Sequence, residues 1–246
     1  MSELIIRSED IFVGVKHVKV MKKIKLLIAL VLVAFTLPAQ DSISHKLRVG
    51  LYANAGTSSL VQGMGMGMNM YGSGYGNNYG SNTNMYTYTG SYGGGLSLTV
   101  PLHQRWSFVG NLGYMNRGAR YGDMYSSSYS SQYRLSYLDI WALGQYNNVP
   151  KGPVKFTASF GLTESTLLSA KEETATGNVN MMDNVNRIDI GMVLGPGLEF
   201  ALKNRGAIQT RLLYTYGFRS AFTGTYYDSG MHSNNAAFLL QVGYLF

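Results

Sequence analysis

The residues best suited to catalysis lie close together near the C-terminal end of the sequence. They are Asp228, Ser229, His232 and Ser233. A histidine near a hydroxyl group and a carboxylate can act as a general base and activate the serine as a nucleophile, which is the chemistry of a hydrolase. Polar loops contain such residues in any case, and no further motif supports catalysis. We therefore expect a protein that is not an enzyme, and a hydrolase is the third of three functional hypotheses.

Metal binding has one candidate group, which consists of four methionines at alternate positions. Their thioether sulfur atoms could bind a soft metal ion. They are Met64, Met66, Met68 and Met70. The surrounding tract is rich in Gly, Tyr, Asn and Met, and this low-complexity composition explains them without a metal. The sequence contains no Cys and its four His are dispersed, so we expect no metal and no cofactor.

The elements that carry the remaining chemistry are long β-strands, because polar and apolar residues alternate along eight segments. Each segment is at least as long as the roughly 9 to 11 residues that a tilted strand needs to cross a bilayer. The segments are 46–56, 91–101, 105–117, 132–146, 154–168, 185–201, 207–220 and 236–246. Their length and pattern predict strands that span a membrane.

The connections between these strands alternate in length. Short links are expected at 102–104, 147–152 and 202–206, and long links at 57–90, 118–131, 169–184 and 221–235. Outer-membrane barrels have short periplasmic turns and long external loops. The sequence therefore predicts an all-β fold, namely an eight-stranded antiparallel up-and-down transmembrane β-barrel in the outer membrane. The alternative is a soluble, lipocalin-like barrel with an apolar interior.

Charged strand residues share one parity, and the other parity is apolar. The charged set is Lys46, Arg48, Arg105, Arg117, Lys155, Arg187, Asp189, Glu199, Arg211 and Arg219, with Glu164 on the opposite face. A basic residue that faces lipid at mid-bilayer costs roughly 2–4 kcal/mol, so the charged parity should face the lumen. For strand 132–146 the phase is a choice, which places Asp139 inside and Leu138, Ile140 and Ala142 outside. The outward aromatics should gather near the two rims: Trp106, Tyr244 and Phe246 at one, and Tyr114, Tyr214, Tyr216 and Phe218 towards the other.

Five of the inward residues are the candidate site. They are Arg48, Asp139, Asp189, Glu199 and Arg211. An eight-stranded barrel is only wide enough for its own side chains to fill it, and buried charges need partners. We expect a structural ion-pair network in a filled lumen; the alternative is a narrow pore.

The N-terminal part of the sequence has the pattern of an export signal. A basic stretch precedes the apolar run Leu26–Leu37, which is too short to span a membrane. We expect a signal peptide at 21–40 and the barrel domain at 41–246, whereas residues 1–20 are explained by an early start codon or an extension. The net charge of +7 comes partly from this leader and is too small for nucleic-acid binding.

Short motifs throughout the exported region are similar to those of a known family. They are Ser136–Ile140, Asp189–Gly191, Gly195–Phe200, Tyr214–Gly217 and Gly243–Phe246. The sequence resembles the PorT-like outer-membrane β-barrel family, which implies a small barrel of the outer membrane. Its last residues, Val242, Tyr244 and Phe246, share a face and resemble the signal read by the barrel-insertion machinery.

The function hypotheses follow from the external loops and the lumen. The first is a structural or surface-interaction barrel, in which Tyr-rich loops contact an external ligand that the sequence does not identify. The second is a small-solute or secretion-associated channel component, and the third is the outer-membrane hydrolase. The expected partners are outer-membrane lipid, the insertion machinery and the external ligand.

Overall fold

Eight long strands form the wall of the molecule. The computed structural model describes residues 47–62, 84–123, 129–148, 153–202, 206–223 and 233–246. The long strands are β1 (Arg48–Gln62), β3 (Thr89–Pro101), β4 (Trp106–Asp123), β5 (Tyr129–Asn147), β6 (Val154–Thr174), β8 (Ile188–Ala201), β9 (Ala207–Ser220) and β10 (Ser233–Leu245). Two short strands, β2 (Asn84–Thr87) and β7 (Gly177–Asn180), add to the sheet.

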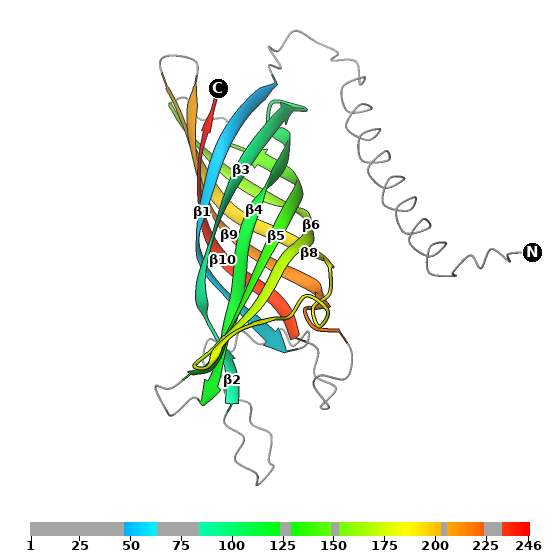
Figure 1. Cartoon of the computed structure of the whole chain (residues 1–246). Coiled ribbons are helices and arrows are strands. Elements are labelled where there is room, and N and C mark those ends of the chain that lie inside the picture. Colours follow the sequence, from blue (N-terminus) through cyan, green and yellow to red (C-terminus); the bar gives the residue numbers. More distant parts are fainter. Residues whose placement is uncertain (1–46, 63–83, 124–128, 149–152, 203–205, 224–232) are drawn as a thin grey trace, which may run out of the picture. The chain divides into compact units, whose positions relative to one another are not determined.

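The sheet closes on itself. Its strand order is β4-β3-β1-β10-β9-β8-β6-β5, and β5 pairs with β4 to complete the ring. Every pairing is antiparallel, including that of the first long strand with the last, where Ala53 lies opposite Val242. The predicted eight-stranded antiparallel barrel is confirmed (Figure 1). The expected signal peptide lies outside the described residues.

Short turns and long connections lie at opposite ends of the barrel. The amide of Leu202 donates to the carbonyl of Gly206 across one short turn, and the amide of Trp106 donates to the carbonyl of His103 in another. The C-terminus lies at this same end, at the top of Figure 1. We call it the periplasmic end and the opposite one the external end, following the orientation that the sequence predicts.

Several strands extend beyond their predicted ends on the external side, including β1, which ends at Gln62 and not at Gly56. β4, β5 and β6 contain 18, 19 and 21 residues, so much of the predicted loops 118–131 and 169–184 is strand. β2 pairs with the end of β4, where Tyr86 lies opposite Tyr121, and β7 pairs with the end of β6. The sequence pattern missed these extensions because water lies on both sides of a sheet above the membrane, which removes the apolar alternation. The result is a projecting sheet, at the bottom of Figure 1.

The outer surface of the barrel is apolar. Leu51, Phe160 and Leu212 are 54%, 56% and 62% exposed, whereas the inward Val109 and Val193 are fully buried. Asp139 is also buried, so strand 132–146 has the phase chosen from the sequence. This arrangement is inverted relative to a soluble barrel and contradicts the lipocalin-like alternative.

One predicted outward aromatic differs from the rest. Tyr216 has the outward parity but is only 8% exposed. Its ring lies 6.3 Å from that of Phe218, and β10 has a register shift between Asn234 and Ala236, next to it. Tyr216 is thus part of the packed wall and is not a free interfacial aromatic.

Among the described residues, no helix is long and apolar enough to cross a membrane.

Candidate functional site

The interior of the barrel begins, at its periplasmic end, with a buried carboxylate shared by two cations. Glu199 of β8 is 1% exposed, and its two carboxylate oxygens accept hydrogen bonds of 2.8 and 3.1 Å from the Arg48 guanidinium of β1. Lys155 of β6 donates to the same carboxylate at 3.3 Å. A paired, hydrogen-bonded carboxylate is what a low-dielectric interior requires. This triad joins three strands that are distant in the sequence.

The next layer consists of a buried arginine held by amide oxygens. Arg211 is 1% exposed. Its Nη1 donates to Gln241 Oε1 at 2.8 Å and its Nη2 to Gln145 Oε1 at 2.7 Å. Gln209 donates to the same Gln145 oxygen at 3.1 Å. These side chains come from β5, β9 and β10 and bridge the lumen.

The next layer towards the external end is apolar. Its buried members are Val109, Met115, Trp141, Leu143, Val193, Leu213, Ala237 and Leu239. The ring of Tyr52 stacks on that of Trp141, with centroids 6.3 Å apart and an interplanar angle of 28°. Gly113 makes room for this pair, because a Cβ at that position would overlap the Tyr52 hydroxyl group. The middle of the barrel is therefore packed with side chains from both halves of the wall.

A second charged group lies on the external side of this layer. Arg117 of β4 forms an ion pair with Asp139 of β5, and both side chains are almost fully buried. Arg117 also donates to Ser165 at 3.3 Å and lies over the Tyr137 ring, 5.6 Å from its centroid.

Asp189 of β8 lies next to this group and is held by a neutral partner. Asn235 of β10 donates to its carboxylate at 2.9 Å. The same amide nitrogen lies 3.3 Å from the hydroxyl oxygen of Tyr137 and donates to it. These contacts tie β10 to β5 and β8 across the lumen.

The external mouth is filled by a second hydrophobic cluster, which we call the cap. Its buried members are Leu60, Ala119, Tyr133, Leu135, Tyr137, Leu167, Ala170, Met181, Val185, Ala221 and Phe222. Val185 forms a β-bridge with Phe222, whose ring contacts that of Tyr133 edge-on at 5.4 Å. Segments expected as polar loops thus fold inwards. The prediction that strand 185–201 begins at Val185 is wrong, since β8 begins at Ile188.

The five predicted site residues do not form one network. Arg48 and Glu199 meet at the periplasmic end, Arg211 binds amides in the next layer, and Asp139 and Asp189 lie in the external charged group, near Arg117. Their inward parity located them correctly within the wall. The sequence analysis did not predict the roles of Gln145, Gln209, Gln241, Tyr52 and Trp141. Their parity also places them inside the barrel, but a search for ion pairs considers only charged residues.

Three predicted inward cations lie elsewhere. Arg105 is exposed in the turn before β4, and Arg187 and Arg219 are exposed at the external rim, where β8 begins and β9 ends. These positions differ from the prediction because each lies at the very end of a strand, where the alternation between lumen and lipid stops. Lys155 is half-exposed at the periplasmic mouth, and Lys46 lies outside the described residues.

Most of the candidate catalytic group and all of the candidate metal site fall outside the part of the chain that the structure describes. Asp228, Ser229 and His232 lie outside the described residues, as do the four methionines of the candidate metal site, and Ser233 is buried at the start of β10. Within the described part of the chain, no group of three or more His, Cys, Asp or Glu residues could hold a metal ion. Val242, Tyr244 and Phe246 all face outwards, and the last two rings contact each other edge-on at 5.0 Å.

Several solved structures are similar to this chain. Ail, the attachment invasion locus protein of Yersinia pestis, is 14% identical over 81% of this chain and 98% of its own, with a TM-score of 0.41. Neisserial surface protein A is 12% identical over 79% and 95%, with a TM-score of 0.44. OprG from Pseudomonas aeruginosa is 10% identical over 83% and 99%, with a TM-score of 0.44. No curated protein matches the sequence.

A family match covers most of the chain. Residues 39–223 match the outer membrane protein beta-barrel domain, and this range contains β1 to β9. The match agrees with the closed antiparallel barrel and its apolar outer surface. The chain therefore belongs to the outer membrane protein beta-barrel family and is a protein of the outer membrane.

Proposed function

We propose that this protein is a closed, non-enzymatic barrel that anchors a folded surface on the outside of the outer membrane and conducts no solute. The observation that carries this proposal is the cap, the hydrophobic cluster that fills the external mouth above an already packed lumen. A pore needs a continuous polar path, and both the cap and the Trp141 layer interrupt such a path with buried apolar side chains.

The inner layers also resist opening by thermal motion. Moving the Arg211 side chain aside would break its hydrogen bonds to Gln145 and Gln241. Hydrogen bonds to a charged group contribute roughly 1.5–3 kcal/mol each. An open state of this layer would therefore be sparsely populated, which supports a structural lumen and argues against a gated channel.

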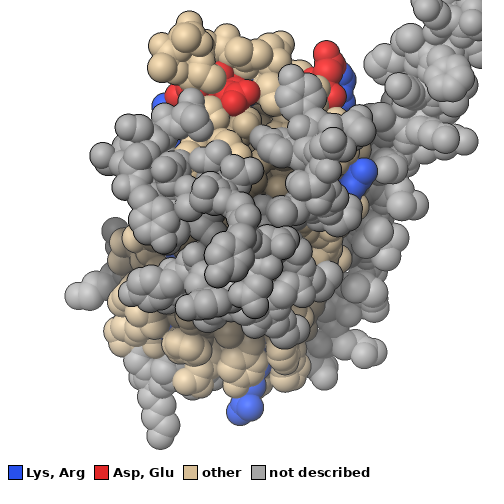
Figure 2. Space-filling view, turned by 90° about the horizontal axis from the view of Figure 1, so that it is seen from below, with Lys and Arg blue, Asp and Glu red and all other residues tan. Residues whose placement is uncertain are grey.

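The surface available to a partner is the projecting sheet of β2, β4, β5, β6 and β7. Figure 2 views the external end and shows acidic side chains gathered at one edge, with basic side chains beside them and singly elsewhere. Val179 of β7 is 52% exposed there, next to polar neighbours. A mixed, partly apolar surface on a rigid sheet favours contact with a macromolecule, and we assign the surface-interaction role to it. The PorT-like resemblance and the insertion-signal role of Val242, Tyr244 and Phe246 form part of this proposal.

Electrical recording tests the closed lumen. The full-length protein is reconstituted in planar bilayers, with a known porin as positive control and Trp141→Gly/Arg211→Ala/Phe222→Ala as a variant emptied at two layers of the lumen and in the cap. We expect silent bilayers for the wild type and intermittent conductance for the variant. Steady single-channel conductance of the wild type would contradict the proposal and support the channel hypothesis.

A second measurement tests the display of the external surface. Protease added to intact cells should cleave the chain in the connections at the external end and leave the strands of the wall protected. Heat-modifiable migration on a gel reports that the barrel is folded in the same sample. Cleavage only after the cells are lysed would contradict the proposed orientation.

A further inference from the structure

The lumen buries an arginine that has no carboxylate partner. Arg211 of β9 is 1% exposed, and within the described part of the chain its hydrogen bonds go to the neutral amides of Gln145 and Gln241. Its Nε–H group has no acceptor. A buried charge without an opposite charge is costly, because the interior offers little solvent to screen it. The Arg211 guanidinium group therefore favours an anionic partner.

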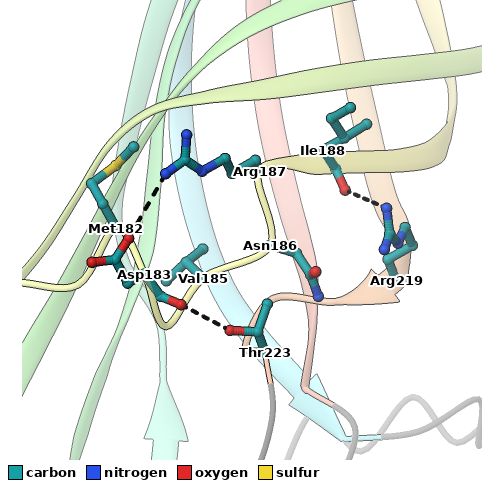
Figure 3. Close-up of a pocket in the computed structure, with 8 residues that line it drawn as sticks. All are labelled: Met182, Asp183, Val185, Asn186, Arg187, Ile188, Arg219 and Thr223. Carbon is teal, nitrogen blue, oxygen red and sulfur yellow. Dashed lines mark hydrogen bonds and ion pairs between the residues drawn. The ribbon is translucent and has the colours of Figure 1, made fainter. Parts of the chain in front are cut away.

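The exposed arginines at the external rim differ from Arg211 in this respect. Figure 3 shows them in a hollow beside β8 and β9, where Arg187 lies 3.8 Å from the carboxylate of Asp183. Arg219 donates to the carbonyl of Ile188 at 3.2 Å. Both arginines are exposed, so solvent can accept from their remaining donors. Arg211 has neither a carboxylate partner among the described residues nor access to solvent.

The nearest charged groups do not compensate Arg211. Glu199 and Arg48 are close enough for their charges to act on it, but both oxygens of the Glu199 carboxylate already bind Arg48. Lys155 lies 3.3 Å from the same carboxylate. These four side chains carry three positive charges and one negative charge, which leaves an excess of two positive charges.

Other polar atoms around Arg211 are buried without a hydrogen-bond partner among the described residues. They are Thr157 Oγ1, Ser159 Oγ and Gln241 Nε2. Thr157 Oγ1 lies beside the Arg211 side chain, because a Cβ built at Gly197 would meet both, at 2.8 and 2.9 Å. Ser159 lies opposite Gln145 in the pairing of β5 with β6. We call this part of the lumen the Arg211 layer.

The Arg211 layer offers more hydrogen-bond donors than acceptors. The Gln145 side-chain oxygen already accepts from both Arg211 and Gln209. Arg211 Nε and Gln241 Nε2 have no acceptor, and hydroxyl groups can donate as well. A water molecule that accepted from these groups would bring its own O–H groups, which also need acceptors. A compact anion only accepts, and it also neutralises the guanidinium charge.

Short side chains leave room for a small occupant in the Arg211 layer. The width of an eight-stranded barrel matches its own inward side chains, and here β6 contributes Thr157 and Ser159 while β8 contributes Gly197. The Trp141 layer closes the external side. At the periplasmic mouth, the Lys155 side chain is 41% exposed and its positive charge attracts anions towards the lumen.

We propose that the Arg211 layer binds one compact monovalent anion, such as chloride. The anion accepts hydrogen bonds from the Arg211 guanidinium group and from the hydroxyl groups of Thr157 and Ser159, and it supplies the missing negative charge. The stability of the barrel then depends on chloride. This inference goes beyond the proposed closed barrel and does not require it, since an ion that enters from the periplasmic end reaches the Trp141 layer and stops there.

The test measures urea-induced unfolding of the full-length protein in lipid vesicles, in sodium chloride and in sodium gluconate at equal concentration. Gluconate is too large for the Arg211 layer. We expect about 300 mM chloride to lower the unfolding equilibrium constant of the wild type about tenfold relative to gluconate, as an ion with a Kd of roughly 30 mM does. Gln241→Glu places a carboxylate where Arg211 now binds an amide oxygen, and this variant should not respond to chloride.

The matched control is Arg134→Gln, which removes an exposed cation outside the lumen and should respond to chloride as the wild type does. Equal stability of the wild type in the two salts would overturn the proposal, as would equal responses of the wild type and Gln241→Glu. Crystals grown in sodium bromide give a direct readout, and we expect an anomalous scattering peak beside Arg211 Nε in the wild type. Its absence would assign the buried donors to water alone. If Gln241→Glu does not fold, the bromide peak decides.

Discussion

The indole nitrogen of Trp141 donates a hydrogen bond to Oδ2 of Asp139, its neighbour on the same face of β5, at 3.2 Å. The same carboxylate pairs with Arg117, and the same indole ring stacks on Tyr52. The Trp141 side chain thus belongs to the apolar layer and also contacts the external charged group. Because these contacts reach β1 and β4 from β5, Trp141 couples the two layers mechanically.

This coupling predicts that the ring and the N–H group of Trp141 each contribute to the free energy of unfolding. Trp141→Ala should lower the free energy of unfolding by about 3–5 kcal/mol, because it leaves a cavity in the packed layer. Trp141→Phe keeps most of the ring but removes the N–H group, and should cost about 1–3 kcal/mol through the loss of one hydrogen bond to a buried carboxylate, whose Oδ2 atom keeps Arg117 as its partner. Urea titration in lipid vesicles, followed by the gel shift of the heat-modifiable form, measures both. A Trp141→Phe variant as stable as the wild type would contradict a role for the hydrogen bond.

The periplasmic triad predicts a difference between buried and exposed ion pairs. Glu199→Gln removes the carboxylate that Arg48 and Lys155 share, and should lower stability by roughly 1–3 kcal/mol because the neighbouring charges lose their partner inside the barrel. Arg134→Gln breaks a pair with Glu173 whose side chains are 46% and 30% exposed, and should change stability by less than about 1 kcal/mol. The same urea titration applies. A larger effect for Arg134→Gln would show that the lumen charges are well solvated.

Close approach of strands predicts opposite results for two glycines. Gly113→Ala places a methyl group against the Tyr52 hydroxyl group and the Gly94 carbonyl, and should cost about 1–3 kcal/mol by overpacking. Gly90→Ala on β3 has no atom within 4 Å of the added carbon and should lie within about 0.5 kcal/mol of wild type. Refolding yield and the urea midpoint report both effects. A neutral Gly113→Ala variant would mean that the Tyr52 ring moves without loss.

Which face of a strand a residue occupies is local information, whereas its partners across the barrel are not. The alternation of residues along each strand located Arg48, Glu199 and Arg211 inside the barrel, because parity is a property of one strand alone. The partners could not be derived in this way. Gln145 and Arg211 come from strands that are 66 residues apart, and whether such side chains meet depends on register and tilt around the whole ring.

The external cap was missed for a different physical reason. Val185 has polar neighbours on both sides, and Phe222 has only Ala221 as an apolar neighbour, so neither creates a periodic signal. They become a cluster only when two connections fold over the same mouth and form the bridge between these residues. Connections that close a barrel in this way look like ordinary loops in the sequence.

The cap and the lumen predict independent barriers to conduction. Phe222→Ala removes a ring that contacts Tyr133 in the cap. It should make protease cleavage of the external connections on intact cells faster than in the wild type, while costing about 3 kcal/mol or less, since the site lies near solvent. Bilayers that contain this variant should stay silent, because the Trp141 layer and the Arg211 layer below remain packed. The matched variant is Phe238→Ala on the lipid-facing side of β10, where the ring is 48% exposed and protease access should not change. Conductance after loss of Phe222 alone would make the cap the sole closure, in which case the lower layers would already admit water and ions.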